Sequence, residues 1–396
     1  MSLRIALYLA LAVAVVNGFA RFAYALILPA MRDSLGWDYA ASGWLNTANS
    51  MGYALGGLSG MLLLAKVRPT QLFAAGLVAT VFCIALVGFT SNLYLMLFWR
   101  LLAGIGSAWV FACGGALVAA YYQSSQDHRS DQANSGAPIA VFFAGGGLGI
   151  ALSGLVVFTV LTGAMTWSHA WITLGLVGAI LAIMPTLTVL RTEPPSPPLR
   201  ASDTPLARGW QWRFMGQYRW IICAYFCFGV GYIVYMTFVI AWLKQMRLSD
   251  GFVASLWIMM GCAAMASGWV WRKAMNSWRP TRTFFAATLC TAIGSAIPIM
   301  VKEPVALMLS TVLVGGSFFM VPGAMTELAK KVLPQLGWAP AMNLFTMIFA
   351  VGQAVGPVMA GAIADSYSLD VAMIFGFVIL ICSAGLALIQ SKASLT

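Results

Sequence analysis

Charged residues are scarce in this sequence, because Asp, Glu, Lys and Arg together make up only 8% of its 396 residues. Soluble domains carry about 25% charged residues, so this scarcity excludes an ordinary soluble globule. The chain is 61% hydrophobic, and apolar runs of about 20 residues, long enough to cross a bilayer as a helix, recur along its length. We therefore predict an all-α integral membrane protein embedded in the lipid bilayer.

Groups for catalysis or metal binding are also few, with two histidines and 11 acidic residues in the whole chain. All seven cysteines fall within apolar segments, which indicates helix packing rather than a disulfide framework or a metal site. The sequence contains no catalytic carboxylate pair and no nucleotide-binding loop. We expect no enzyme activity, no cofactor and no metal. A membrane-embedded enzyme or sensor is the alternative from another class, and no motif supports it.

Twelve apolar segments predict twelve transmembrane helices. Their approximate bounds are 5–30, 40–65, 70–90, 93–121, 137–162, 168–190, 218–243, 252–272, 281–300, 304–329, 338–364 and 369–390. With both termini in the cytoplasm, sixteen Lys and Arg residues fall in cytoplasmic segments and four in outer loops, as the positive-inside rule requires. The net charge of +11 is therefore a topology signal and predicts no nucleic-acid partner.

The predicted helices form two pseudo-symmetric halves. A polar segment rich in Pro and Arg, 191–217, separates six helices in 1–190 from six in 218–396, and we expect it to be a cytoplasmic linker. Gly18 and Tyr24 of the first helix correspond to Gly229 and Tyr235 of the seventh, 211 positions later. Such a repeat of six-helix units is known in one large class of transporters, whose substrate site lies between the halves.

The excess of positive charge inside the membrane is the main functional signal. Arg21 and Arg100 lie within apolar spans, roughly 13 Å below Ala30 and roughly 10 Å below Leu93 at 1.5 Å per residue, and no acidic residue lies at comparable depth. An arginine in hydrocarbon costs about 2.5–3.5 kcal/mol or more, so it normally faces a partner, a watery cavity or a ligand. The missing partner predicts an anionic substrate.

Three motifs resemble the major facilitator superfamily. The segment 100–106, Arg-Leu-Leu-Ala-Gly-Ile-Gly, is similar to its Arg-x-x-x-Gly-x-Gly signature, and 352–361 is similar to its usual eleventh helix. The segment 18–31, which begins Gly-Phe-Ala-Arg-Phe-Ala-Tyr, resembles the YbfB/YjiJ-like branch. The resemblance covers the whole chain. It implies alternating access, in which two six-helix halves move around a central cavity lined mostly by helices 1, 4, 7 and 10.

Two departures weaken the interpretation as a proton-driven drug antiporter. The loop after the second helix carries Leu64 where the superfamily usually has a gating Asp, and the glycine-rich stretch 145–154 lacks the proline typical of antiporters. The sequence therefore favours a transporter of a small, monocarboxylate-like organic anion, working as a uniporter or proton symporter in a bacterial inner membrane. The alternative is a proton-coupled exporter of amphipathic compounds or drugs. From the superfamily, we expect a monomer.

Arg21 is the first choice for the substrate site, because a guanidinium binds a carboxylate through two parallel hydrogen bonds. Alternatively, it caps carbonyls at a helix break or extends outward past Pro29. Arg100 has a structural alternative, since the signature it belongs to is tied to helix packing. Further candidates for substrate binding are aromatic or amide side chains for which packing or interhelical hydrogen bonding is the alternative: Phe22, Tyr24, Asn49, Tyr232 and Tyr235.

Proton coupling usually requires a carboxylate or histidine within the membrane. Glu327, at the cytoplasmic end of the tenth predicted helix, is the acidic candidate, although Lys330 and Lys331 beside it indicate a solvated helix end. The alternative carrier of a proton is the carboxylate of the substrate itself.

Overall fold

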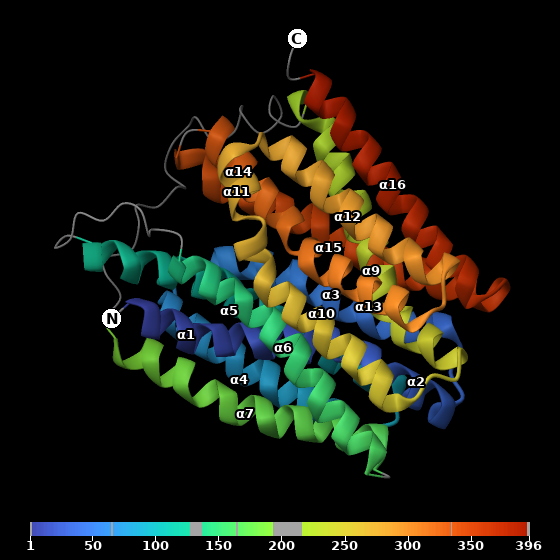
Figure 1. Ribbon diagram of the computed structural model, residues 1–396. Helices are drawn as coiled ribbons and strands as arrows, with labels where there is room; N and C mark the ends of the chain where they lie inside the picture. Colours follow the sequence, from blue (N-terminus) through green and yellow to red (C-terminus); the bar gives the residue numbers. More distant parts are fainter. Residues whose placement is uncertain are drawn as a thin grey trace.

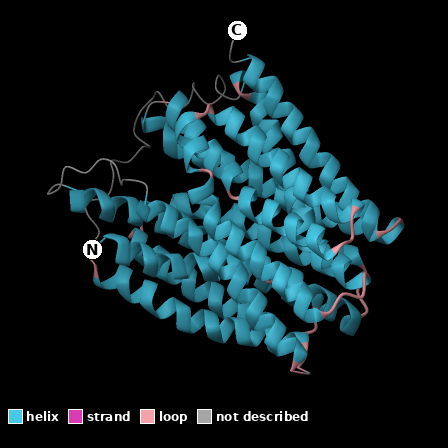
Figure 2. Cartoon of the chain, viewed as in Figure 1, coloured by secondary structure: helices cyan, strands magenta, loops and turns pink. Residues whose placement is uncertain are grey.

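The computed structural model describes residues 2–64, 66–126, 137–163, 165–192, 216–333 and 335–393, which are helical throughout apart from short connections (Figure 2). The helical elements are α1 (Ser2–Val13), η1 (Ala14–Phe22), α2 (Tyr24–Leu35), α3 (Tyr39–Leu63), α4 (Pro69–Val87), α5 (Leu93–Gln126), α6 (Ala137–Thr162), α7 (Trp167–Arg191), α9 (Arg219–Gln245), α10 (Asp250–Val270), α11 (Arg272–Ser277), α12 (Pro280–Met300), α13 (Pro304–Phe318), α14 (Met320–Val332), α15 (Gln335–Ser366) and α16 (Leu369–Ala393).

Each of the twelve predicted spans is helical in the structure. Eleven helical segments among the described residues are long and apolar enough to cross a membrane. The remaining one, α3, has 25 residues but carries buried polar side chains that lower its hydropathy, among them Asn46 and Asn49. It packs between α5 and α15. Residues 193–215 of the predicted linker lie outside the described residues, so the proposed domain bounds stay a prediction.

The two halves approach each other at one end of the molecule and diverge toward the other. We call the end that holds residues 36–38 and 246–249 the outer end, following the predicted topology. Figure 1 shows α7 of the first half and α16 of the second diverging away from it, toward the end where both termini lie. Near the outer end, Asp365 of α15 accepts hydrogen bonds of 2.8 Å from the backbone N–H groups of Tyr39 and Ala40, which begin α3.

The first membrane helix is not a uniform α-helix. Its central nine residues, η1, form a π-helix between α1 and α2. π-Helical turns are rare and occur frequently at functional sites. The segment packs closely on α6, where a Cβ atom on Gly18 would overlap the backbone of Gly149. The wider turn contains Asn17 and Arg21, both buried.

The tenth predicted helix consists of two helices that meet at Phe319, α13 and α14. Pro322 has no N–H, so the carbonyl of Phe318 lacks the hydrogen bond that a continuous α-helix would give it. The break places Phe318 and Phe319 where the rings face Phe22 of the first half.

Candidate functional site

Arg21 lies in the interior, between the two halves. It is 6% exposed, and one of its Nη nitrogens donates a hydrogen bond to Oε1 of Gln353 on α15. Its guanidinium carbon lies 4.8 Å from the ring centre of Tyr53 on α3, a cation–π contact. Arg21 therefore joins the first half to the second through a neutral partner.

The hydrogen-bond chain continues into the seventh membrane helix. Nε2 of Gln353 donates to the hydroxyl of Tyr232 on α9. The Tyr232 ring stacks on those of Phe228 and Phe349, at centroid distances of 5.1 Å and 5.4 Å. Because its ring is held between neighbours, the Tyr232 hydroxyl has a fixed position at the end of the chain Arg21–Gln353–Tyr232.

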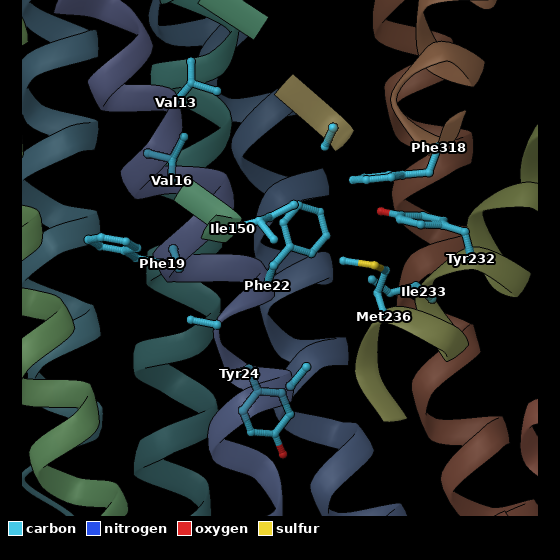
Figure 3. Close-up of a cluster of buried hydrophobic side chains, with 14 of the residues drawn as sticks. Val13, Val16, Phe19, Phe22, Tyr24, Ile150, Tyr232, Ile233, Met236 and Phe318 are labelled. Carbon is cyan, nitrogen blue, oxygen red and sulfur yellow. The ribbon is translucent and has the colours of Figure 1, made fainter. Parts of the chain in front are cut away.

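Phe22 places an aromatic ring beside this chain. Its ring meets those of Phe318 and Phe319 edge-on, at 5.9 Å and 6.3 Å, and Phe318 stacks on Tyr232 at 5.9 Å. Figure 3 shows Phe22 pointing across the interface toward Phe318 and Tyr232. Aromatic rings from both halves thus surround the polar chain.

Donors at both ends of the hydrogen-bond chain have no acceptor among the described residues. Nε of Arg21 is buried without a hydrogen-bond partner. The hydroxyl of Tyr232 accepts from Gln353, and a hydroxyl retains one O–H donor when it only accepts. A buried unsatisfied donor costs about 1–3 kcal/mol, more when charged. The site therefore has unused donors of the kind that an oxyanion would accept from.

Arg100 is equally buried but contacts its own half. It is 1% exposed, donates to the carbonyl of Ala20 in η1 and, through Nε at 3.3 Å, to that of Leu45 in α3. Its guanidinium carbon lies 5.4 Å from the Tyr24 ring centre and 5.3 Å from that of Trp171. One nitrogen, Nη2, has no partner among the described residues. Arg100 thus connects the first, second, fourth and sixth membrane helices.

Tyr24 and Asn49 belong to the surroundings of Arg100. The Tyr24 hydroxyl donates to the Ser42 carbonyl at 2.7 Å, and in Figure 3 it points away from the Phe22 and Tyr232 rings. Nδ2 of Asn49 donates to the backbone carbonyl of Arg100 at 3.1 Å. The structure does not bring these two candidates to the chain that contains Arg21.

The two remaining candidates lie elsewhere. The Tyr235 hydroxyl lies 3.1 Å from Oγ of Ser310 on α13. Glu327 of α14 is paired with Lys330, with 3.1 Å between the carboxylate and the ammonium group, and its side chain is 29% exposed. No group of three His, Cys, Asp or Glu that could hold a metal ion occurs within the described residues.

Sequence reasoning missed Gln353 as a site residue. The expected cavity was lined mostly by helices 1, 4, 7 and 10, whereas Gln353 lies on the eleventh and is 0% exposed. An amide within an apolar span is itself a signal, because polar side chains in membranes face partners or cavities. Tyr53 was not predicted as a site residue either, and its place against Arg21 depends on how α3 packs between α5 and α15.

Comparison with solved structures shows the fold. A point mutant of the nucleoside transporter NupG matches with a TM-score of 0.76 and 14% identity, covering 97% of this chain and 99% of that one. A bacterial homologue of the human lysosomal transporter Spinster, in an inward-facing and occupied conformation, matches with a TM-score of 0.75 and 14% identity, covering 99% and 98%. No curated protein matches the sequence.

A family model spans nearly the whole sequence. The model described as "Uncharacterised MFS-type transporter YbfB" matches residues 12–388. This chain therefore belongs to the YbfB-like family of major facilitator superfamily transporters.

Proposed function

We propose that this transporter carries a small organic anion of the monocarboxylate type, and that Arg21 binds its carboxylate. The family is one of transporters and not of enzymes. The observation that carries the proposal is a buried guanidinium whose hydrogen-bond partner is the neutral amide of Gln353. The nucleoside and lysosomal-type transporters with the same fold are too distant, at 14% identity, to indicate the substrate.

Charge balance supports an anion. The salt bridges of the described residues involve Asp33, Asp250 and Glu327, all with side chains that are partly or largely exposed. Arg21 has no such partner, and an unpaired buried charge costs several kcal/mol. A carboxylate would offset that cost and accept the charge-assisted hydrogen bond that Nε of Arg21 leaves unmade.

The position of the site supports alternating access. Arg21 is contributed by the first half, whereas Gln353 and Tyr232 come from the second. A ligand between them contacts both halves, so its binding energy depends on their relative placement. This is the arrangement through which a bound substrate biases a two-state transporter, since a ligand shifts a conformational equilibrium only by its differential affinity.

We further propose uniport or proton symport in a bacterial inner membrane. Glu327 is the acidic coupling candidate, but its carboxylate pairs with Lys330 at the end opposite the outer one. The substrate's own carboxylate is the other possible proton carrier. Uptake by a symporter should accelerate as the pH on the uptake side falls, and a pH-independent rate would count against symport.

A thermal-shift assay tests the anion site. We would heat the purified protein, Arg21→Ala and Arg219→Ala with lactate, gluconate or 4-hydroxybenzoate against chloride at equal ionic strength. Arg219 is an exposed arginine at the start of α9, so its variant controls for loss of one charge. A ligand at 100 times its dissociation constant stabilises by about 2.7 kcal/mol.

We expect at least one carboxylate to stabilise the parent and Arg219→Ala but not Arg21→Ala. Stabilisation by lipophilic cations alone would contradict the anion proposal and favour an exporter of amphipathic compounds. If a carboxylate stabilised Arg21→Ala as much as the parent, the anion would bind at a site that does not include Arg21.

A further inference from the structure

We propose that the Gln353 side chain takes the place of the substrate's carboxylate when the site is empty, and that substrate binding displaces it from Arg21. This inference rests on the proposed function. It assigns to Gln353 the role of positioning Arg21, through a hydrogen bond that is present without substrate and broken when substrate binds. It makes one contact between the halves, the Arg21–Gln353 hydrogen bond, dependent on the ligand.

The amide has the shape of the group it replaces. A glutamine amide and a carboxylate are both planar and present an oxygen acceptor at the same distance from their carbon atom. Gln353 uses this oxygen to accept from Arg21. An ionised acceptor, however, makes a hydrogen bond roughly twice as strong as a neutral one. A substrate carboxylate can therefore displace the amide, whereas a resident Asp or Glu would compete with it on equal terms.

The amide nitrogen of Gln353 contacts a second donor group that a bound carboxylate could use. Nε2 of Gln353 donates to the Tyr232 hydroxyl, whose own proton has no acceptor among the described residues. Nε of Arg21 is likewise unpartnered. These unused donors lie at opposite ends of the same three-residue hydrogen-bond chain. A carboxylate that displaced Gln353 could accept from both.

The same exchange changes the contact between the halves. Arg21 lies on η1 of the first half and Gln353 on α15 of the second. In the empty site their hydrogen bond ties the halves directly. With substrate bound, this link between the halves runs through the substrate instead of through Gln353.

Gln353→Glu is the sharpest test, because it places a carboxylate permanently on Arg21 with almost no change in shape. Its second oxygen can accept from the Tyr232 hydroxyl, so no buried group loses a partner. We expect this variant to melt several degrees higher than the parent without ligand, and to lose the stabilisation by carboxylates. Its apparent affinity for the stabilising carboxylate among lactate, gluconate and 4-hydroxybenzoate should fall more than about tenfold, or about 1.4 kcal/mol.

Gln353→Leu is the matched neutral comparison, similar in size but without an acceptor. It should melt lower than the parent, because Arg21 loses its partner, yet keep or strengthen the stabilisation by the same carboxylate. If this variant does not fold, Gln353→Asn, which withdraws the amide by one methylene group, takes its place. A purely structural role for Gln353 predicts instead that every variant melts lower and that affinity does not depend on the charge at this position.

The outcomes separate this inference from the proposed function. If no carboxylate stabilises the parent, the proposed function fails and the inference fails with it. If a carboxylate stabilises the parent and Gln353→Glu binds it as tightly, the inference alone is overturned. Loss of the response in Gln353→Glu together with its retention in the neutral variant supports both.

Discussion

Two arginines of similar burial have different surroundings, and the difference lies in their acceptors. Arg100 donates to backbone carbonyls of its own half, from Ala20 and Leu45. Those acceptors belong to the same half as Arg100. Arg21 instead depends on Gln353, an acceptor across the interface. We infer that Arg100 stabilises the packing of the first half, whereas Arg21 can exchange its hydrogen-bond partner when a ligand binds.

Arg100→Lys should lower stability without abolishing carboxylate binding. A lysine keeps the charge but has no planar fork to reach the carbonyls of Ala20 and Leu45 together. The loss of hydrogen bonds from a charged group is worth about 1.5–3 kcal/mol each. Thermal unfolding with and without the stabilising carboxylate measures both effects. A variant that melts normally but no longer responds to the ligand would place Arg100 in the binding site.

For single residues, the sequence identifies the buried arginines but not the side chains that contact them. Arg21 and Arg100 stand out because an ionised side chain in an apolar span is costly. Gln353 and Tyr53 reach Arg21 only through the rotation and register of α15 and α3, which depend on contacts between distant segments. The sequence predicts Tyr24 as an aromatic site residue of the first helix and Asn49 as a polar one of the second, yet their hydrogen bonds are to Ser42 and Arg100.

The π-helical element η1 is the clearest case in which the structure of an element differs from what its sequence pattern predicts. The apolar run of the first helix predicts a span, and the span is present. Its π-helical centre lies in tight contact with α6, where Gly18 and Gly149 have no side chains to separate the two backbones. The break between α13 and α14 has a more local cause in Pro322.

Gly18→Ala should therefore destabilise the protein. Its Cβ atom would overlap the backbone of Gly149, which cannot move as a flexible side chain can. Overpacking of this kind costs about 1–3 kcal/mol. Gly57→Ala is the matched control, since a Cβ atom there meets nothing within 4 Å. Thermal unfolding that affects the two variants equally would contradict the close contact between η1 and α6.

Asp365 of α15 should protect the first turn of α3 at the outer end. Its two carboxylate oxygens accept from the N–H groups of Tyr39 and Ala40, which lack partners within their own helix. Asp365→Ala removes an N-terminal cap worth about 1 kcal/mol. Hydrogen–deuterium exchange of a peptide covering residues 37–45 should become faster.

Asp33→Ala is the control for that measurement, because Asp33 lies on the same surface and pairs only with Arg32 at 3.6 Å among the described residues. Unchanged exchange in Asp365→Ala would mean that α15 does not hold α3 in solution.

For the whole molecule, composition and charge distribution predict most of the architecture. The apolar runs predict the twelve spans, because each must cover the hydrocarbon core and satisfy its own backbone. The motifs at 18–31, 100–106 and 352–361 identify the superfamily. The sequence does not predict which ends of the halves are in contact, since that depends on contacts between helices far apart in the sequence.

The topology is testable with reporter fusions. Both termini should lie in the cytoplasm, because this orientation places sixteen basic residues inside and four outside. Green fluorescent protein fused after Thr396 should fluoresce, and alkaline phosphatase fused after Lys302 should be active. A non-fluorescent fusion after Thr396 together with an inactive phosphatase after Lys302 would show that the orientation is the opposite one.

Uptake into proteoliposomes tests the central claim most directly. We would add radiolabelled lactate, gluconate or 4-hydroxybenzoate to the outside of liposomes that contain the parent, Arg21→Ala or Arg219→Ala. Liposomes without protein give the background. The account predicts saturable uptake of a carboxylate by the parent and by Arg219→Ala, and background uptake by Arg21→Ala. Full carboxylate uptake by Arg21→Ala would contradict the assignment of Arg21 as the anion site.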